Sequence, residues 1–156
     1  MANSPKILAL DQLAQQLGRD RAAQRRVIHC HGVFDLLHIG HIRYLQRARK
    51  LGDLLVVTIT PDHFVNKGPH RPAFQAKLRA DALAALDCVD YVAINQWQTA
   101  CEAIRLLGPN IYAKGGEFRD HKTPELLAEE EAAQEVGAKV EFIEEVTSSS
   151  SHLLNK

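Results

Sequence analysis

Histidines and glycines gather in one short stretch of the chain, from His31 to His41. His38 and His41 stand three positions apart, so in a helix their imidazoles would lie on roughly one face. Gly40 leaves no side chain between them, which lets a ligand approach the backbone closely. A loop that enters a helix also presents backbone N–H groups to an anion. The spacing therefore predicts a triphosphate site in which imidazoles take the place of the usual lysine.

Strands and helices alternate along the chain and must position this stretch. An apolar run at 27–30 precedes it as a strand, and a helix with an apolar face follows at 40–51. Residues 54–60 form a run typical of a strand buried on both faces of a parallel sheet. With neither repeat nor linker, we predict one domain over 1–156 with an α/β fold, a Rossmann-like parallel five-stranded sheet flanked by helices. The remaining predicted elements are strands at 91–94, 111–113 and 140–143 and helices at 11–17, 74–86, 99–108, 124–136 and from 147.

Local signals set the predicted ends and faces of several helices. Gly18 is predicted to end the first helix. Thr99 and Glu102 match a capping box for the helix that follows them. Thr123 is predicted to cap the helix that has Pro124 at its first position. In the helix at 74–86, the predicted core-facing residues are Leu78, Ala82, Ala85 and Leu86.

Two motifs should meet at one edge of the predicted sheet. In parallel sheets of this type, ligands bind beyond the carboxyl ends of the strands. The histidine-rich stretch follows the first strand, and Lys114-Gly115-Gly116 is a predicted turn after the strand at 111–113. Both motifs should therefore face the same crevice, and the polar loop at 61–72 is long enough to move over it.

The order of the motifs resembles a known family. Gly-Val-Phe-Asp followed by His38-Ile39-Gly40-His41 resembles the His-x-Gly-His signature of the cytidylyltransferase-like nucleotidyltransferase superfamily. Further motifs resemble one branch, the heptose 1-phosphate adenylyltransferase domain of bifunctional heptose kinase/adenylyltransferases. The resemblance covers nearly the whole chain and implies the HUP-type fold of nucleotidyltransferases. The motifs that match this branch are Lys67-Gly68, Arg71-Pro72, Arg79, Lys114-Gly115-Gly116-Glu117-Phe118 and Ser149-Ser150-Ser151.

This resemblance implies an enzyme that transfers a nucleoside monophosphate from a nucleoside triphosphate to a small phosphorylated acceptor. An oxygen of the acceptor attacks the α-phosphorus, and pyrophosphate leaves. Such a transfer depends on positioning and charge stabilisation rather than on a nucleophilic side chain. Mg²⁺ is expected with the triphosphate, held by phosphates and waters without dedicated protein ligands.

The resemblance also implies roles for individual residues. The residues expected to contact the triphosphate and stabilise its charge are His38, His41, Lys67 and Arg79. Lys67 and Arg71 are expected to bind the acceptor phosphate. The expected nucleotide-binding residues are Gly32, Val33, Phe34, Asp35, His38, Gly40, His41, Lys114, Gly115, Gly116, Ser149, Ser150 and Ser151.

Several of these residues also have a purely structural interpretation. His38 and His41 could be a helix cap and a core histidine, as paired histidines often are. Asp35 could hold the geometry of the loop or lie near the metal. Arg71 could simply be exposed, and Arg79 could form a surface salt bridge.

A zinc site is the rival interpretation for four histidines, since His29 and His31 alternate onto one face of the strand end and precede His38 and His41. Zinc sites usually show Cys or His pairs backed by carboxylates, which disfavours this interpretation. The chain also departs from the family in two places. Relatives often have asparagine at the position of His31 and a glutamate just before Arg79.

Two motifs bear on the nucleotide and the acceptor. Glycerol-phosphate and ethanolamine-phosphate cytidylyltransferases carry Arg-Thr-Glu-Gly where this chain has Glu144-Glu145-Val146-Thr147, which disfavours that CTP site. Lys-Gly-Gly-Glu-Phe resembles the Lys-Gly-Gly-Asp-Tyr of the heptose adenylyltransferases. We therefore predict ATP as the nucleotide and a sugar 1-phosphate, such as heptose 1-phosphate, as the acceptor. The alternatives are a CTP-dependent enzyme acting on a polyol or amino-alcohol phosphate, and an inactive nucleotide-binding module.

Composition argues against several other classes of function. The 156 residues carry 19 basic and 19 acidic side chains, so no basic surplus attracts nucleic acid or an anionic membrane. No apolar run approaches the ~20 residues of a membrane span. Cys30, Cys88 and Cys101 lack the spacing of metal ligands and fit reduced thiols in a cytoplasmic protein.

The resemblance is also compatible with larger assemblies. A homodimer fits the family. The chain stops almost at the start of its last predicted helix, so we expect either a trimmed protein or the N-terminal part of a longer one. A sugar kinase, covalently linked or separate, is the expected partner.

Overall fold

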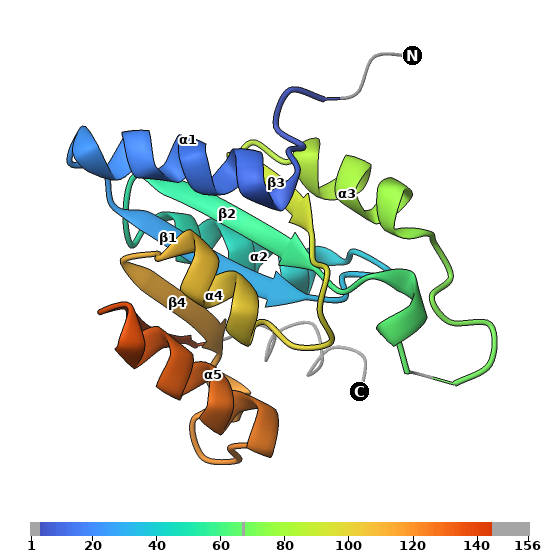
Figure 1. Cartoon of the computed structure of the whole chain (residues 1–156). Coiled ribbons are helices and arrows are strands. Elements are labelled where there is room, and N and C mark those ends of the chain that lie inside the picture. Colours follow the sequence, from blue (N-terminus) through green and yellow to red (C-terminus); the bar gives the residue numbers. More distant parts are fainter. Residues whose placement is uncertain (1–3, 67, 145–156) are drawn as a thin grey trace.

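Five parallel strands form one sheet in the order β3-β2-β1-β4-β5 (Figure 1). The structure is a computed structural model and describes residues 4–66 and 68–144. The sheet confirms the predicted α/β class and its Rossmann-like arrangement. The strands are β1 (Val27–Gly32), β2 (Leu54–Ile59), β3 (Tyr91–Ile94), β4 (Ile111–Gly115) and β5 (Lys139–Ile143).

Helices cover both faces of this sheet. Cys30 of β1 belongs to the same buried cluster as Leu45 of α2 and Leu83 of α3. Val27 of β1 packs instead with Leu13 of α1, on the opposite face. Figure 1 shows α4 and α5 on this second face as well. The helices are α1 (Leu10–Ala22), α2 (Ile39–Arg49), α3 (Ala76–Ala84), α4 (Cys101–Leu107) and α5 (Pro124–Glu135), with short 3₁₀ turns η1 (Asp62–Phe64) and η2 (Gly116–Phe118).

Alternation along the central strands decides which side chains reach each layer. Cys30 and Ala113 face α2 and α3, where they join the largest cluster. His29 and Tyr112 face the other layer, with their ring centroids 5.3 Å apart. All six residues of β2 are buried, which confirms the prediction for this strand. The sheet therefore carries polar rings on one face only.

The first helix is longer than predicted. Gly18 does not end it, and the helix continues to Ala22. Leu13, Leu17 and Asp20 continue one buried stripe through the glycine. A glycine inside a helix costs about 1 kcal/mol relative to alanine, which this packing outweighs.

The predicted core face of α3 is wrong. Leu78 is 54% exposed, and of the predicted residues only Leu86 packs against the core. Alanines lie on both sides of this helix, so its apolar pattern does not define a face. Arg79 lies on the buried face of α3, where an apolar residue would be expected, and its guanidinium donates to oxygen acceptors there. The buried residues of α3 are Ala76, Arg79, Ala80, Leu83 and Ala84.

The capping prediction is confirmed for α5 and wrong for α4. The Oγ1 of Thr123 accepts a hydrogen bond from the N–H of Leu126 at 3.1 Å. α4 begins at Cys101, and Thr99 accepts only a 3.4 Å hydrogen bond from the N–H of Cys101. Glu102 is therefore inside the first turn and cannot complete a capping box.

The strands that lead to the predicted site are longer than expected. Lys114 and Gly115 pair with Phe142 and Ile143 of β5, so they belong to β4 and not to a turn. β1 likewise continues to Gly32. Both extensions carry the two motifs further along the sheet, to its carboxyl edge.

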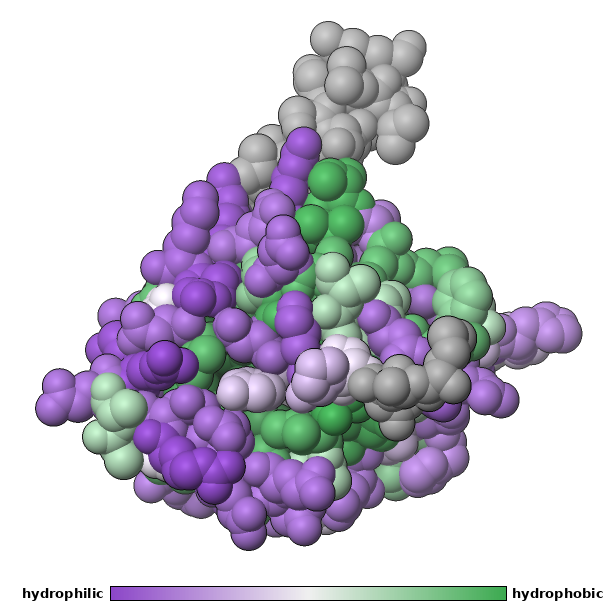
Figure 2. All heavy atoms as spheres, turned by 90° about the horizontal axis from the view of Figure 1, so that it is seen from above, coloured by the Kyte–Doolittle hydropathy of each residue, from purple (hydrophilic) through white to green (hydrophobic). Residues whose placement is uncertain are grey.

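One face of the molecule is mainly polar. Seen from above the view of Figure 1, hydrophilic residues predominate and apolar residues form smaller areas between them (Figure 2). In the described part of the chain, no helix is both long and apolar enough to cross a membrane.

Candidate nucleotide-binding site

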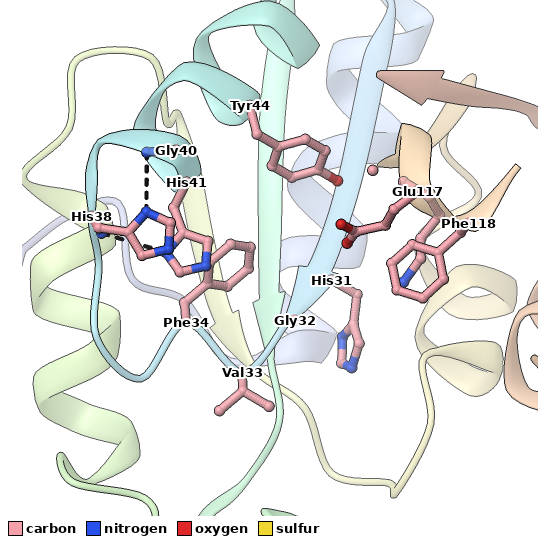
Figure 3. Close-up of a pocket in the computed structure, with 12 residues that line it drawn as sticks. His31, Gly32, Val33, Phe34, His38, Gly40, His41, Tyr44, Glu117 and Phe118 are labelled. Carbon is pink, nitrogen blue, oxygen red and sulfur yellow. Dashed lines mark hydrogen bonds between the residues drawn. The ribbon is translucent and has the colours of Figure 1, made fainter. Parts of the chain in front are cut away.

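A pocket of about 390 Å³ opens where β1 and β4 end, beside the N-terminus of α2 (Figure 3). The structure thus brings the histidine-rich stretch and the Lys-Gly motif together, as predicted from the parallel sheet. Extended strands deliver both motifs to the same edge, and the loop after β1 turns back into α2. The residues that line the pocket are His31, Gly32, Val33, Phe34, His38, Gly40, His41, Tyr44, Lys114, Gly115, Glu117 and Phe118.

The imidazoles of His38 and His41 lie against each other, with ring centroids 3.9 Å apart. The Nδ1 of His38 accepts a hydrogen bond from the N–H of Gly40 at 3.1 Å, and the Nδ1 of His41 accepts one from the N–H of His38 at 3.4 Å. A neutral imidazole whose Nδ1 accepts carries its proton on Nε2. Each ring can therefore donate an N–H at the positive end of the helix dipole. His38 therefore caps α2, as in the structural interpretation, and it also lines the pocket. Its contact with a triphosphate stays a prediction.

Phe34 shapes the loop between β1 and α2. Its φ is 50°, in the left-handed region that side chains rarely adopt. Its ring meets the edge of the His41 ring, with centroids 5.6 Å apart. A Cβ added at Gly32 would come within 2.9 Å of the Phe34 ring, so the close approach requires glycine there.

The carboxylate of Asp35 joins this loop to the segment before α3. It accepts hydrogen bonds from the N–H groups of Ala73 at 2.7 Å and Phe74 at 2.9 Å, and it pairs with the Nε of Arg71 at 2.7 Å. Burial acts to raise the pKa of Asp35, but these hydrogen bonds and the guanidinium outweigh burial and lower it. Asp35 therefore holds the geometry of the loop. Arg71 is bound to this carboxylate rather than simply exposed.

Arg79 does not line the pocket. Its side chain is fully buried, and its guanidinium donates to the carbonyl oxygens of Phe74 at 3.0 Å and Val33 at 2.9 Å. It also pairs with Asp62 at 2.6 Å. Arg79 is therefore not at the surface, which contradicts the interpretation as a surface salt bridge. Its predicted contact with the triphosphate stays a prediction. Arg79 positions the backbone of Val33, which does line the pocket.

Lys114 and Gly115 line the pocket from β4, whereas Gly116 does not. The Nζ of Lys114 lies 3.8 Å from a carboxylate oxygen of Glu129 and 4.7 Å from the centroid of the Phe118 ring. A Cβ added at Gly116 would come within 3.0 Å of a carbonyl oxygen at the end of β5. Gly116 therefore allows close packing against the end of β5, and its predicted role in nucleotide binding stays a prediction.

Two further histidines converge on one hydroxyl. The Nε2 of His29 lies 2.7 Å from the Oγ1 of Thr58, and the Nδ1 of His31 lies 2.8 Å from it. His38 and His41 turn toward each other instead, so the four histidines do not surround a common point. Among the residues that the structure describes, no group of three or more His, Cys, Asp or Glu could hold a metal ion. The zinc interpretation therefore has no support.

The fully buried His29 and the partly buried His31 should make stability depend on pH. Burial lowers the pKa of His29 and of His31 from 6.5 to about 3. A lowered histidine pKa means that the unfolded chain binds protons first, so the stabilisation is complete above pH 6.5 and is lost toward about pH 3. We expect the free energy of unfolding to fall by up to about 1.4 kcal/mol per pH unit for each histidine.

Urea unfolding between pH 7.5 and pH 5 tests this expectation, with a His29→Gln/His31→Asn variant as the comparison. In each protein, the slope of the free energy of unfolding against pH is measured. The difference between the two slopes removes the contribution of every other titrating group. The variant should show the shallower dependence on pH. Equal slopes would mean that these rings do not titrate as their burial requires.

Four pocket residues were not predicted as site residues: His31, Tyr44, Glu117 and Phe118. The hydroxyl of Tyr44 donates to the carbonyl oxygen of Ala113 at 2.8 Å, which joins α2 to β4. Tyr44 follows His41 by one helical turn, and this spacing was an available signal. Glu117 and Phe118 directly follow the Lys-Gly-Gly motif and share its edge of the sheet.

Some predicted site residues lie outside the described part of the chain. These are Lys67 and the serines of the predicted last helix, Ser149, Ser150 and Ser151. Their expected contacts with phosphate stay predictions.

Comparison with known proteins identifies a family and relatives. The cytidylyltransferase-like family matches residues 29–153. A protein described as "Bifunctional protein HldE" from Citrifermentans bemidjiense is 41% identical over 154 residues, which are 97% of this chain and 31% of that protein. Another of that description, from Pelobacter propionicus, is 44% identical over 140 residues, covering 88% of this chain and 28% of that protein. The chain therefore spans less than a third of the length of these relatives.

Solved structures share the fold. The lipopolysaccharide core biosynthesis protein from Thermoplasma volcanium is 27% identical, with a TM-score of 0.63 over 78% of this chain and 96% of that one. A pantoate-beta-alanine ligase from Francisella tularensis is 16% identical, with a TM-score of 0.60 over 94% of this chain and 72% of that one, and shows the fold alone. These neighbours confirm the fold predicted from the sequence.

Proposed function

This chain belongs to the cytidylyltransferase-like family, and we propose that it transfers the adenylyl group of ATP to a sugar 1-phosphate such as heptose 1-phosphate, with release of pyrophosphate. The observation that carries the proposal is the pair of adjacent imidazoles, His38 and His41, at the N-terminus of α2. Both line a pocket that Lys114 and Gly115 border from β4. Donors at the positive end of a helix suit the phosphates of a nucleotide.

In the proposed reaction, an oxygen of the acceptor phosphate attacks the α-phosphorus. The bond from that phosphorus to the bridging oxygen of pyrophosphate breaks, and charge develops on the phosphoryl and leaving oxygens. The Nε2–H groups of His38 and His41 would donate to these oxygens. One preorganised donor of this kind contributes about 3 kcal/mol to the stability of the transition state.

ATP is favoured over CTP by two features of the chain. The Lys-Gly-Gly-Glu-Phe motif, which begins at Lys114, resembles that of heptose adenylyltransferases. Glu144 stands at the position of an arginine in the cytidylyltransferases named above, and its carboxylate pairs with Arg119. The relatives described as bifunctional HldE proteins support the same branch.

Mg²⁺ is proposed as the companion of the triphosphate. The carboxylate of Asp35 is already engaged by two N–H groups and by Arg71, and the described residues offer no carboxylate cluster. The side chains present therefore fit an ion held by phosphates and waters. When bound, the ion would offset phosphate charge, while the histidines hold the phosphoryl oxygens in position.

A sugar kinase is the proposed functional partner, because the HldE relatives are described as bifunctional and are more than three times as long as this chain. The sugar 1-phosphate would then come from a preceding phosphorylation. Cys30, Cys88 and Cys101 are free thiols, which fits a reducing compartment such as the cytoplasm. A homodimer stays a prediction.

The test is pyrophosphate release by the purified protein with Mg²⁺, each nucleoside triphosphate in turn, and a panel of sugar 1-phosphates and polyol phosphates. We expect release with ATP and a heptose 1-phosphate. Release with CTP alone would assign the chain to a cytidylyltransferase. Nucleotide binding by calorimetry without any release would favour an inactive binding module.

A further inference from the structure

One hydroxyl beneath the pocket is shared by two imidazoles. The Oγ1 of Thr58 lies 2.7 Å from the Nε2 of His29 and 2.8 Å from the Nδ1 of His31. A hydroxyl has one proton, so Thr58 can donate to only one of the rings and must accept from the other. The direction of these two hydrogen bonds, that is, which group donates in each, decides which ring nitrogen carries the proton in both imidazoles.

The surroundings of His29 decide the direction of both hydrogen bonds. Its Nδ1 is buried and has no hydrogen-bond partner. If Thr58 donated to His29, that Nδ1 would carry a buried N–H without an acceptor. Buried N–H groups without a partner are rarer than acceptors left unpaired. In the favoured arrangement, the Nε2–H of His29 therefore donates to Thr58, and the Thr58 hydroxyl donates to the Nδ1 of His31.

The consequence appears at the pocket. Because its Nδ1 accepts from Thr58, His31 carries its proton on Nε2, and His31 lines the pocket. Lys114 borders the same pocket from the neighbouring strand, β4. Figure 3 shows the His31 ring well apart from the adjacent rings of His38 and His41. The pocket thus has donors at two separate places.

Burial of His31 supports a neutral ring. Burial and the nearby charge of Lys114 lower its pKa to about 3, so the ring stays uncharged at physiological pH. Lys114 lines the pocket, and its ammonium also lies 3.8 Å from a carboxylate oxygen of Glu129, which does not line it. One neutral N–H and one cation are suited to an oxygen of a phosphate group.

We propose that Thr58 fixes His31 as an Nε2–H donor, which together with Lys114 binds a phosphoryl oxygen of the ligand at a second place in the pocket. The oxygen belongs either to the nucleoside triphosphate or to the phosphorylated acceptor. The ligand part of this proposal rests on the proposed function, whereas the proton position does not.

Long-range ¹H–¹⁵N spectra of the histidine side chains test the proton position in the ligand-free protein. His29 and His31 should both appear as neutral Nε2–H tautomers between pH 8 and pH 6. Thr58→Ser keeps the hydroxyl and should keep these spectra, whereas Thr58→Val removes it and should give mixed tautomers at His31. A wild-type His31 protonated on Nδ1 would overturn the proposal.

Binding measurements test the ligand. His31→Leu should weaken binding about tenfold or more, as expected for loss of a hydrogen bond to a charged group. Two probes are used separately: a non-hydrolysable ATP analogue with Mg²⁺, and mannose 1-phosphate. The probe whose binding is weakened by His31→Leu identifies the source of the oxygen. His31→Gln, which keeps an N–H donor, should recover part of the affinity, and His121→Leu is the exposed control.

The outcomes separate this proposal from the proposed function. If the wild type binds at least one probe and His31→Leu weakens the binding of neither, the ligand role of His31 is contradicted and the proposed function is not. A wild-type protein that binds neither probe would contradict the proposed function and the ligand part together. The tautomer result would then still decide the role of Thr58.

Discussion

Replacing His41 with alanine should lower the rate of pyrophosphate release by about a hundredfold or more. His41 lines the pocket, and its Nδ1 accepts from the backbone of His38, so a neutral ring carries its proton on Nε2. The variant loses a donor to the oxygens on which charge develops. The loss should appear mainly in kcat, because the interaction strengthens as the transition state forms.

The matching control is His121→Ala, an exposed histidine outside the pocket. Both variants should keep the unfolding midpoint of the wild type within a few degrees. His41→Ala with normal kcat and a raised KM would show that this ring contributes to binding only. An unfolded His41→Ala protein would shift the test to His41→Asn, which keeps an N–H donor and should retain more activity than a leucine at the same position.

Asp35→Ala should cause the largest loss of stability among the pocket loop residues. The carboxylate accepts from two backbone N–H groups and pairs with Arg71, and its side chain is only 1% exposed. Its removal leaves the N–H groups of Ala73 and Phe74 without their acceptor. We expect the free energy of unfolding to fall by about 3 kcal/mol, as measured by urea denaturation at pH 7.

Asp35→Asn should lose an intermediate amount of stability. Its amide oxygen can still accept a hydrogen bond, but its NH₂ group would face one of the donors that the carboxylate now binds. Asp81→Ala, an exposed carboxylate on α3, should change stability by less than about 0.5 kcal/mol. If Asp35→Ala kept full stability but lost activity, the carboxylate would act on the ligand or its metal ion rather than on the loop.

The sheet and its edge were predictable because their signals are local. The run at 54–60 consists of leucine, valine, isoleucine and threonine alone, and this pattern is typical of a strand covered on both sides. The position of His38, Gly40 and His41 after a strand predicted a helix N-terminus at the pocket. Parallel topology then placed Lys114 at the same edge, since the carboxyl ends of parallel strands share one side.

What could not be predicted depends on partners distant in the sequence. Arg79 is buried because the carbonyl oxygens of Val33 and Phe74 and the carboxylate of Asp62 surround it. Its own helix gives no sign of them, and its alanines allow either face to point inward. The bridge through Thr58 likewise requires the register of β1 and β2, which composition does not specify.

The central claim is attack on the α-phosphorus of ATP, and the position of a label tests it most directly. The wild-type protein would be incubated with Mg²⁺, a heptose 1-phosphate and ATP labelled either at the α- or at the γ-phosphate. We predict that the α-label enters a nucleoside diphosphate sugar and that the γ-label leaves in pyrophosphate. Transfer of the γ-label to the sugar phosphate, or no transfer of either label by folded protein with any nucleotide and acceptor tested, would contradict the account.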